Sequence, residues 1–254
     1  MKLKRQIKFL SVIMSGVLAC FSSSAFGFGS ESHRYITKYS IEKLGDMSKN
    51  LLSEQKINEK EFSTIENMKD KYKNVIINYS LKPDEDENQG GYKKHFYNPV
   101  TERNFLGEKE TACLKCLEHY SNAINYHIMM DGEKEYEELG RAIHFLEDAN
   151  TCVHTGYVNP TDSVIKFPLH VKFENKCDLV KETCSACMSP ESLDYYKSNS
   201  LENIIKSSAI LSMDNFYRLE NTDEEMEDLA CNAILNAQKK IIGLLYRFAN
   251  EVSN

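Results

Sequence analysis

Apolar residues recur along this chain at the spacing of amphipathic helices. The stretch 225–252 shows this most clearly, because its apolar residues share one helical face and its polar residues share the other. The same spacing predicts further helices at residues 33–44, 50–79 (one or two helices), 112–130, 134–150 and from 169–175 onward. Alternating strand patterns and internal repeats do not stand out. We therefore expect an all-α fold, a single-domain multi-helix bundle.

Three stretches interrupt this spacing and predict loops. Residues 81–104 combine two prolines with two glycines, which is typical of a long functional loop. Residues 151–167 contain Gly156 and Pro160, and residues 177–198 carry three cysteines. Elsewhere such interruptions are rare, since the 254 residues include only 5 prolines and 11 glycines, and this favours long helices over many short strands.

The first 27 residues have the pattern of a secretory signal peptide. Four basic side chains precede a 13-residue apolar core at 9–21, and small residues follow it. A membrane-spanning helix needs about 20 apolar residues, so this core is too short to span. Cleavage would leave either Phe26 or Phe28 first, and lipid attachment at Cys20 is a third possibility. We expect residues 1–27 to be removed and residues 28–254 to form one secreted or periplasmic domain.

The balance of charge narrows the possible functions. The formal charge is −7, and it becomes −11 once the four basic residues of the signal peptide are removed. A surface this acidic repels nucleic-acid phosphates, so we expect no nucleic-acid partner. It suits a protein that takes up several divalent cations.

Seven cysteines remain in residues 28–254. In an exported protein they predict disulfide bonds with one thiol left over, although their pairing cannot be deduced from the sequence. The pairs Cys113/Cys116 and Cys184/Cys187 are alternatively the ligands of a structural four-cysteine zinc site. Export favours disulfides. Cys231, in the amphipathic stretch 225–252, is expected to pack in the core.

Two pairs of a histidine and a carboxylate, each four residues apart, carry the strongest chemical signal. They are His144 with Asp148, and His170 with Glu174. Side chains at positions i and i+4 share one helical face, so a nitrogen and an oxygen there can converge on one metal ion. A single such pair is commonly a solvated helix pair. Two pairs with His154 between them predict a metal site.

Further donors precede these pairs. Asp84 and His95 belong to the expected loop 81–104, and His33 lies close to the mature N-terminus. Cleavage after Gly27 would free the α-amino group of Phe28, and its carbonyl could bind the same ion. By contrast, His119 and His127 have no carboxylate partner in the pattern. We expect them to be structural or surface residues.

This order of donors resembles that of the bacterial zinc-dependent phospholipase C family, which includes the clostridial α-toxins and the phosphatidylcholine-hydrolysing phospholipase C of bacilli. The fungal single-strand-specific zinc nucleases are more distantly similar. The resemblance covers residues 28–252 and is carried by the His95-Phe-Tyr-x-Pro segment and by residues 144–154, 167–174 and 243–248. It implies a helical bundle built around a trinuclear zinc site.

The resemblance also implies a ligand set for three zinc ions per chain. One zinc would be held by Asp84, His95, His144 and Asp148. A second would be held by His154, His170 and Glu174. The third would be held by the Phe28 amine and carbonyl, His33 and a shared Asp148. Asp84 is the implied catalytic residue, which would orient or deprotonate the attacking water.

The implied activity is hydrolysis of glycerophospholipids, foremost phosphatidylcholine, to diacylglycerol and a phosphorylated head group by a metal-activated water. Such an enzyme would be a monomer in peripheral contact with membranes. One alternative is a nuclease or nucleotidase of the fungal type, which the five-residue step from Phe28 to His33 matches. The acidic surface and the Glu at position 174 speak against it. A non-catalytic zinc-binding or lipid-binding protein is a further alternative.

Four positions depart from the family pattern. Phe28 replaces a tryptophan, Asn98 and Val100 stand where the family commonly has aspartates, and Cys152 replaces a proline. The donors at position 28 are backbone atoms, so the first change leaves metal binding possible. The change at Cys152 is expected to reshape the wall near His154.

Overall fold

The computed structural model describes residues 28–86 and 91–254, with the side chains of residues 162–164 outside that description. The predicted signal peptide and Cys20 lie outside the described residues. In chain order the helices are α2 (Ser30–Ser53), α3 (Glu59–Asp70), α4 (Lys73–Tyr79), α5 (Lys82–Asp86), η1 (Tyr92–His95), α6 (Ala112–Ile128), α7 (Gly132–Asp148), α8 (Cys152–Thr155), α9 (Pro160–Ile165), α10 (Phe167–Val180), η2 (Lys181–Thr183), α11 (Pro190–Ser198), α12 (Leu201–Met213), η3 (Phe216–Glu220) and α13 (Asp223–Ser253). Within the described ranges the extended backbone amounts to one isolated bridge between Asn98 and Arg103. The all-α prediction is confirmed.

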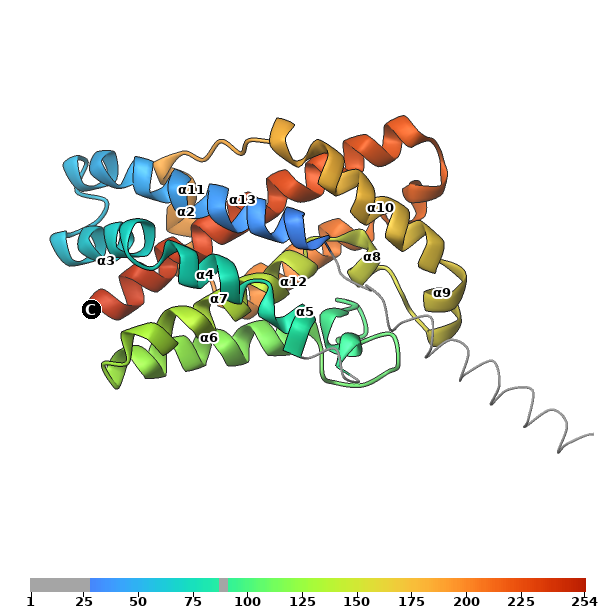
Figure 1. Cartoon of the computed structure of the whole chain (residues 1–254), viewed down its shortest axis with the longest axis horizontal. Coiled ribbons are helices and arrows are strands. Elements are labelled where there is room, and N and C mark those ends of the chain that lie inside the picture. Colours follow the sequence, from blue (N-terminus) through green and yellow to red (C-terminus); the bar gives the residue numbers. More distant parts are fainter. Residues whose placement is uncertain (1–27, 87–90) are drawn as a thin grey trace, which may run out of the picture.

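The C-terminal helix α13 is the axis of the bundle. Its 31 residues run along the length of the molecule and pack against α2, α3, α10 and α11 (Figure 1). Thr222 caps its first turn by accepting a hydrogen bond from the Glu225 amide, and three acidic residues there suit the positive end of the helix dipole. The apolar face predicted for residues 225–252 is buried, with Ile241, Leu245 and Phe248 fully inaccessible.

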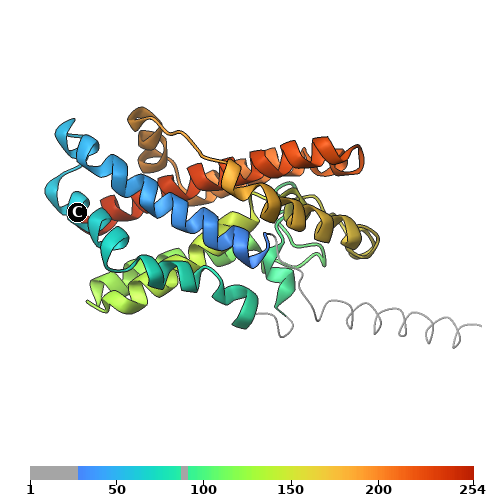
Figure 2. The same ribbon diagram turned by 45° about the horizontal axis from the view of Figure 1, so that its top comes forward.

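The helices α6 and α7 form an antiparallel hairpin beside this axis, and α2 lies on the other side of α7 (Figure 2). The N-terminal half of α7 is charged on its outer side, but every residue from Ala142 to Asp148 is buried. The last two turns of α7 therefore bring polar side chains into the interior. His144 and Asp148 are two of them.

The predicted ligands lie at the end of the bundle opposite the C-terminus (Figure 1). There the short helices α5 and α8 meet the first turns of α2 and α10 and the last turn of α7. The nine residues predicted as ligands lie on these elements, at the end of η1 or, for Phe28, two residues before α2. The predicted ligands are thus carried mainly by the ends of packed helices.

The expected loops contain more helix than predicted. Residues 81–104 include α5 and η1, so Asp84 lies on a short helix and His95 at the end of another. Residues 151–167 include α8 and α9, and residues 177–198 contain the end of α10 and all of α11. The helix α12 has no counterpart among the predicted elements. In the part of the chain described, no helix is both long and apolar enough to cross a membrane.

The seven described cysteines are free thiols. The sulfur atoms of Cys184 and Cys231 lie 2.6 Å apart, where the loop after η2 meets α13. Cys231 is half-buried against the core, close to the position expected for it. Among the described residues, the groups with metal-binding geometry contain only histidines and carboxylates. The four-cysteine zinc site is therefore not formed.

A close approach of two helices places α7 against α4. A Cβ atom at Gly140 would lie only 2.6 Å from the carbonyl oxygen of Ile76 and 2.8 Å from the Tyr79 Cβ. Backbone atoms cannot move aside as the end of a flexible side chain can. The absence of a side chain at Gly140 therefore sets the distance between these helices, one turn before His144.

We expect Gly140→Ala to lower the free energy of unfolding by about 1–3 kcal/mol, because the added methyl group forces α4 and α7 apart. Urea denaturation of the purified protein measures this change. Gly132→Ala is the matched control, since its Cβ would meet only the hydroxyl end of Tyr72 at 3.2 Å. Equal denaturation midpoints for Gly140→Ala and the wild type would contradict the packing described here.

Candidate metal centre

The tautomer of His144 is fixed by a backbone group. Its Nδ1 lies 2.8 Å from the carbonyl oxygen of Ser80, at the end of α4. A carbonyl can only accept, so Nδ1 carries the hydrogen and Nε2 keeps a lone pair when the ring is neutral. That lone pair faces Asp84 Oδ1 at 3.4 Å and Asp148 Oδ2 at 3.3 Å. A lone pair that faces two carboxylates requires a cation or a proton between them.

His95 completes this first group. Its Nδ1 lies 2.8 Å from Asp148 Oδ2, 3.0 Å from His144 Nε2 and 3.7 Å from Asp84 Oδ1. The four side chains come from η1, α5 and α7, and all are buried. The ligand atoms of His95, His144 and Asp148 fall within 4.8 Å of one another, as one ion would require.

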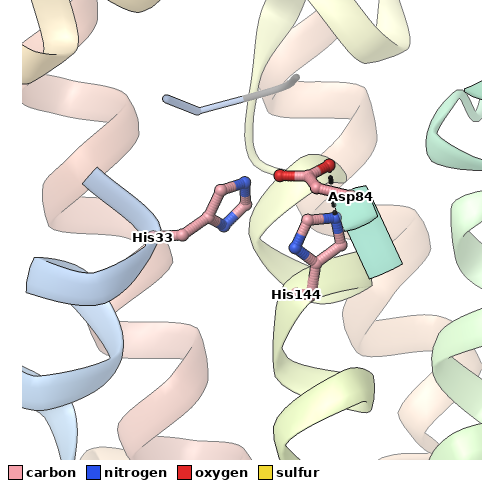
Figure 3. A group of neighbouring side chains, drawn as sticks. All are labelled: His33, Asp84 and His144. Carbon is pink, nitrogen blue, oxygen red and sulfur yellow. Dashed lines mark ion pairs between the residues drawn. The ribbon is translucent and has the colours of Figure 1, made fainter. Parts of the chain in front are cut away.

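The start of α2 carries His33 into the same centre. The structure groups His33 with Asp84 and His144, again with the ligand atoms within 4.8 Å of one another (Figure 3). In that view the rings of His33 and His144 face each other, and the ring centroids are 4.3 Å apart. His33 Nε2 lies 3.8 Å from Asp148 Oδ1.

Asp178 of α10 holds the N-terminal segment in place. Ser32 Oγ donates to Asp178 Oδ1 at 2.5 Å, so the carboxylate lies at the positive end of α2. A Cβ atom at Gly29 would lie 2.5 Å from Asp178 Oδ2, so a larger residue there would displace this carboxylate. The adjoining Phe28 is fully buried, and its ring meets His33 edge-on at 5.7 Å.

A second group lies on α8 and α10. His170 Nε2 is 2.8 Å from Glu174 Oε1, as expected for positions i and i+4 of one helix. The rings of His154 and His170 are 5.0 Å apart, and the ligand atoms of these three residues fall within 4.8 Å of one another. His154 Nδ1 also lies 3.2 Å from Asp148 Oδ1. Asp148 therefore contacts both groups, with a different oxygen toward each.

Several buried nitrogen and oxygen atoms of this centre make no hydrogen bond with any described residue. In the described part of the chain, the buried side-chain atoms without a hydrogen bond include His33 Nε2, both oxygens of Asp84, His95 Nε2, Asp148 Oδ1 and both nitrogens of His154. Buried polar atoms without partners are rare in folded proteins. Imidazole nitrogens and carboxylate oxygens are the donors of catalytic zinc sites, so the donor set fits zinc.

The pKa values of His144 and Asp148 reflect how closely the buried imidazoles and carboxylates approach one another. Burial by itself would lower the pKa of His144, but the Asp84 and Asp148 carboxylates raise it well above its ordinary value. Burial would raise the pKa of Asp148, but the imidazoles around it lower that pKa well below its ordinary value. The two carboxylates thus favour a positive charge beside His144.

Burial dominates at the remaining groups. It raises the pKa of Asp84, against the opposing effect of His144. It raises the pKa of Glu174 to about 7 and lowers the pKa of His154 to about 4. For His33, burial and then the neighbouring His144 lower the pKa well below its ordinary value, so this ring is neutral.

The structure brings all eight predicted side-chain ligands together at one end of the bundle. The second predicted set, His154, His170 and Glu174, forms one group. In the first predicted set, the two histidines and Asp148 form one group, and Asp84 lies beside it. The third differs, because His33 is grouped with Asp84 and His144. In the whole chain the nitrogen of Phe28 is a peptide amide, since Gly27 precedes it.

His119 and His127 lie outside this centre, as expected, but each has a carboxylate partner that the sequence pattern did not show. His119 Nδ1 is 2.8 Å from Glu138, and His127 Nδ1 is 3.1 Å from Glu135. Glu147, which contacts His33, was not among the predicted residues. It follows His144 by three residues and therefore shares its helical face, but the sequence pattern does not show its partner on α2.

A cavity of about 370 Å³ lies behind the segment that follows His95. Tyr97, Thr111, Cys113 and Glu202 are among the residues that line it, and none of the nine predicted ligands is. This cavity is therefore separate from the metal centre.

Comparison with known proteins gives a consistent result. No family model matches the chain. It is 28% identical over 198 residues to a phospholipase C of Clostridium perfringens, a match that covers 69% of this chain and 49% of that enzyme. It is 29% identical over 200 residues to a phospholipase C of Paraclostridium bifermentans, with the same coverage. The chain thus spans about half the length of the curated relatives it matches.

The fold comparison extends over nearly the whole chain. The alpha toxin of Clostridium absonum superimposes with a TM-score of 0.77 and 26% identity, over 92% of this chain and 66% of the toxin. An alpha-toxin from an avian strain of Clostridium perfringens gives a TM-score of 0.73 at 24% identity, which supports the fold. Sequence and fold thus confirm the resemblance of this chain to the bacterial zinc-dependent phospholipase C family that the donor pattern carries.

Proposed function

We propose that this chain is a zinc-dependent phospholipase C that hydrolyses glycerophospholipids, foremost phosphatidylcholine, to diacylglycerol and the phosphorylated head group. One observation carries the proposal. Buried nitrogen and oxygen atoms without hydrogen-bond partners converge at one end of a fold similar to that of proteins named phospholipase C and alpha toxin. Phosphodiester hydrolysis by metal ions requires ligands that hold the ions close together, and the clustered atoms of this chain meet that requirement.

The ligand roles proposed for the chain follow its geometry. Asp84, His95, His144 and Asp148 would hold one zinc, and His154, His170 and Glu174 a second. His33, a shared Asp148 and the backbone of Phe28 would hold the third. The two oxygens of Asp148 already face different groups, which supports its role as the shared ligand.

Bound zinc would supply positive charge to the phosphodiester and acidify the attacking water. The protein would position that water and remove its proton. Asp84 is suited to this task, because both its oxygens are buried without hydrogen-bond partners while its pKa is raised by burial. A buried carboxylate of raised pKa beside the reacting atoms can act as a general base.

Contact with a lipid surface would occur at the same end of the molecule. The segment between His154 and His170 exposes two large apolar side chains, Val158 at 54% and Ile165 at 67%. We propose these two side chains as candidates for peripheral contact with lipid at this end of the molecule.

The alternative function is that of a nuclease or nucleotidase with the same metal chemistry. The spacing of Phe28 and His33 favours it, and the acidic charge of the chain opposes it. The two functions differ in substrate and not in ligands. A test of either must therefore measure products from both substrates.

We expect the wild-type protein to convert phosphatidylcholine to diacylglycerol on thin-layer analysis and to release no nucleotides from single-stranded DNA. His144→Ala and Asp148→Ala should abolish the activity and reduce the zinc content, because these side chains anchor the first group. His127→Ala, at a half-exposed ring outside the centre, should change neither. Retention of tightly bound zinc and full activity in both centre variants would refute the proposal.

Asp84→Asn is predicted to lower kcat by about 10²–10⁴, since an amide cannot take the proton of the attacking water. Asp86→Asn is the matched control on the same short helix, because Asp86 is half-exposed and pairs with Arg141 at 2.6 Å. Steady-state kinetics on a soluble phosphocholine ester compares the two variants. An unchanged kcat for Asp84→Asn would show that another group handles the proton.

Export and disulfide formation belong to the same proposal. The predicted signal peptide would direct secretion, and cleavage after Gly27 would free the Phe28 amine for the third zinc. The 2.6 Å separation of the Cys184 and Cys231 sulfurs supports a disulfide between them, since a disulfide bond is about 2.05 Å long. Its formation removes two protons and two electrons, which a disulfide-bearing oxidant accepts by thiol exchange.

The exported protein should therefore begin with Phe28 and carry one disulfide between Cys184 and Cys231. Intact-mass analysis would show the loss of residues 1–27 and of two hydrogens, and non-reducing peptide mapping would recover the linked peptides. Cys231→Ser serves as the reference that lacks the link. A mature protein that begins with Phe26, or that has both thiols free after export, would contradict this scheme.

A further inference from the structure

Glu147 is a buried carboxylate that the proposed reaction does not use. It lies on α7 between His144 and Asp148, and solvent does not reach it. Burial of a charged group without partners costs several kcal/mol. The ion pairs found among the described residues join Glu147 to a histidine and not to any lysine or arginine. Its location in the interior therefore depends on hydrogen bonds.

Both oxygens of Glu147 contact α2. Oε2 contacts His33 Nδ1, and Oε1 accepts a hydrogen bond from Thr37 Oγ1 at 2.9 Å. His33 and Thr37 are four residues apart on α2, so they face Glu147 from adjacent turns of one helix. Thr37 thereby fixes the orientation of the carboxylate, and the carboxylate can fix the orientation of the imidazole.

The contact with Glu147 determines which nitrogen of His33 is available. Only one proton fits between Nδ1 and Oε2, and when it resides on Nδ1 the Nε2 lone pair is free. Nε2 has no hydrogen-bond partner among the described residues and lies 3.8 Å from Asp148 Oδ1. A metal-binding histidine commonly donates its other N–H to a carboxylate in this way.

Two neighbouring rings restrain the plane of the His33 ring. It stacks on His144 with an interplanar angle of 21°, and Phe28 meets its edge at 88°. These contacts limit rotation of the ring, but they do not select the tautomer. Glu147 is the partner that can do so.

We propose that Glu147 is a positioning residue, which holds His33 in the Nδ1–H tautomer so that Nε2 points at the metal centre. Glu147 is not itself proposed as a ligand, because its oxygens are directed at α2 and it belongs to none of the metal-binding groups in the described residues. The inference rests on the proposed role of His33 as a zinc ligand.

The test measures zinc binding and does not depend on activity. Zinc content is determined by elemental analysis, and the affinity of each ion by competition with a chelator of known affinity. Glu147→Met, which removes the acceptor, should weaken one of the bound zinc ions about 10–100-fold and leave the others unchanged. Glu147→Gln keeps an acceptor oxygen without the charge, so its loss should be smaller. His33→Ala should weaken the same ion.

Glu138→Gln is the matched control. Glu138 also contacts a histidine, His119, and also accepts from a second side chain, Asn122 at 3.0 Å, but it lies outside the metal centre. The same change of carboxylate to amide should leave all zinc affinities at wild-type values. Far-UV circular dichroism verifies that each variant is folded.

The outcomes separate the inference from the proposed function. Wild-type zinc affinities in Glu147→Met and Glu147→Gln, together with a loss in His33→Ala, would overturn the positioning role alone. If Glu147→Met does not fold, Glu147→Gln decides by the same criterion. A wild-type chain that binds no zinc would overturn the proposed function and this inference with it. A zinc-binding chain in which His33→Ala has no effect would refute the ligand role of His33.

Discussion

The arrangement of this protein depends on the repulsion among buried lone pairs at one end of the bundle. Five imidazoles and three carboxylates meet there with little access to water. They cannot satisfy one another, because ionised carboxylates and neutral imidazole nitrogens are mostly acceptors. The raised pKa values of His144 and Glu174 reflect this repulsion, because a proton at either group relieves part of it. Divalent cations would relieve it more fully, so binding of the proposed metal ions would be coupled to folding.

The rest of the bundle keeps these groups from moving apart. The carbonyl of Ser80 orients His144, Asp178 holds the first turn of α2, and Gly140 sets the distance between α4 and α7. None of these contacts would touch a substrate. They place side chains on helix ends, where a shift of a fraction of an ångström is resisted by the whole packed core. Precision at the centre therefore comes from ordinary packing farther away.

The sequence predicted the parts of this centre that depend on local geometry. The pairs at His144 and His170 were found because the i and i+4 positions of a helix are adjacent whatever the fold. The helical state of Asp84 was missed, since Pro83 and the nearby glycines favour a loop and only tertiary packing favours α5. The partner of His33 was missed for a similar reason, because 114 residues separate it from Glu147. Contacts of that span depend on how α2 and α7 pack, which periodicity does not specify.

The proposed third zinc, at His33 and Phe28, would bind at a different stage from the other two. The peptide amide of Phe28 has no lone pair to offer, and only cleavage after Gly27 would convert it into an amine. The contacts of His33 with Glu147 and of Ser32 with Asp178 do not involve the Phe28 nitrogen, so the proposed site could be organised before its last donor exists. The other two groups consist of side chains alone and do not depend on cleavage. We therefore expect the first two ions to bind to a folded precursor and the third to bind after processing, which would delay the complete centre until the protein has left the cytoplasm.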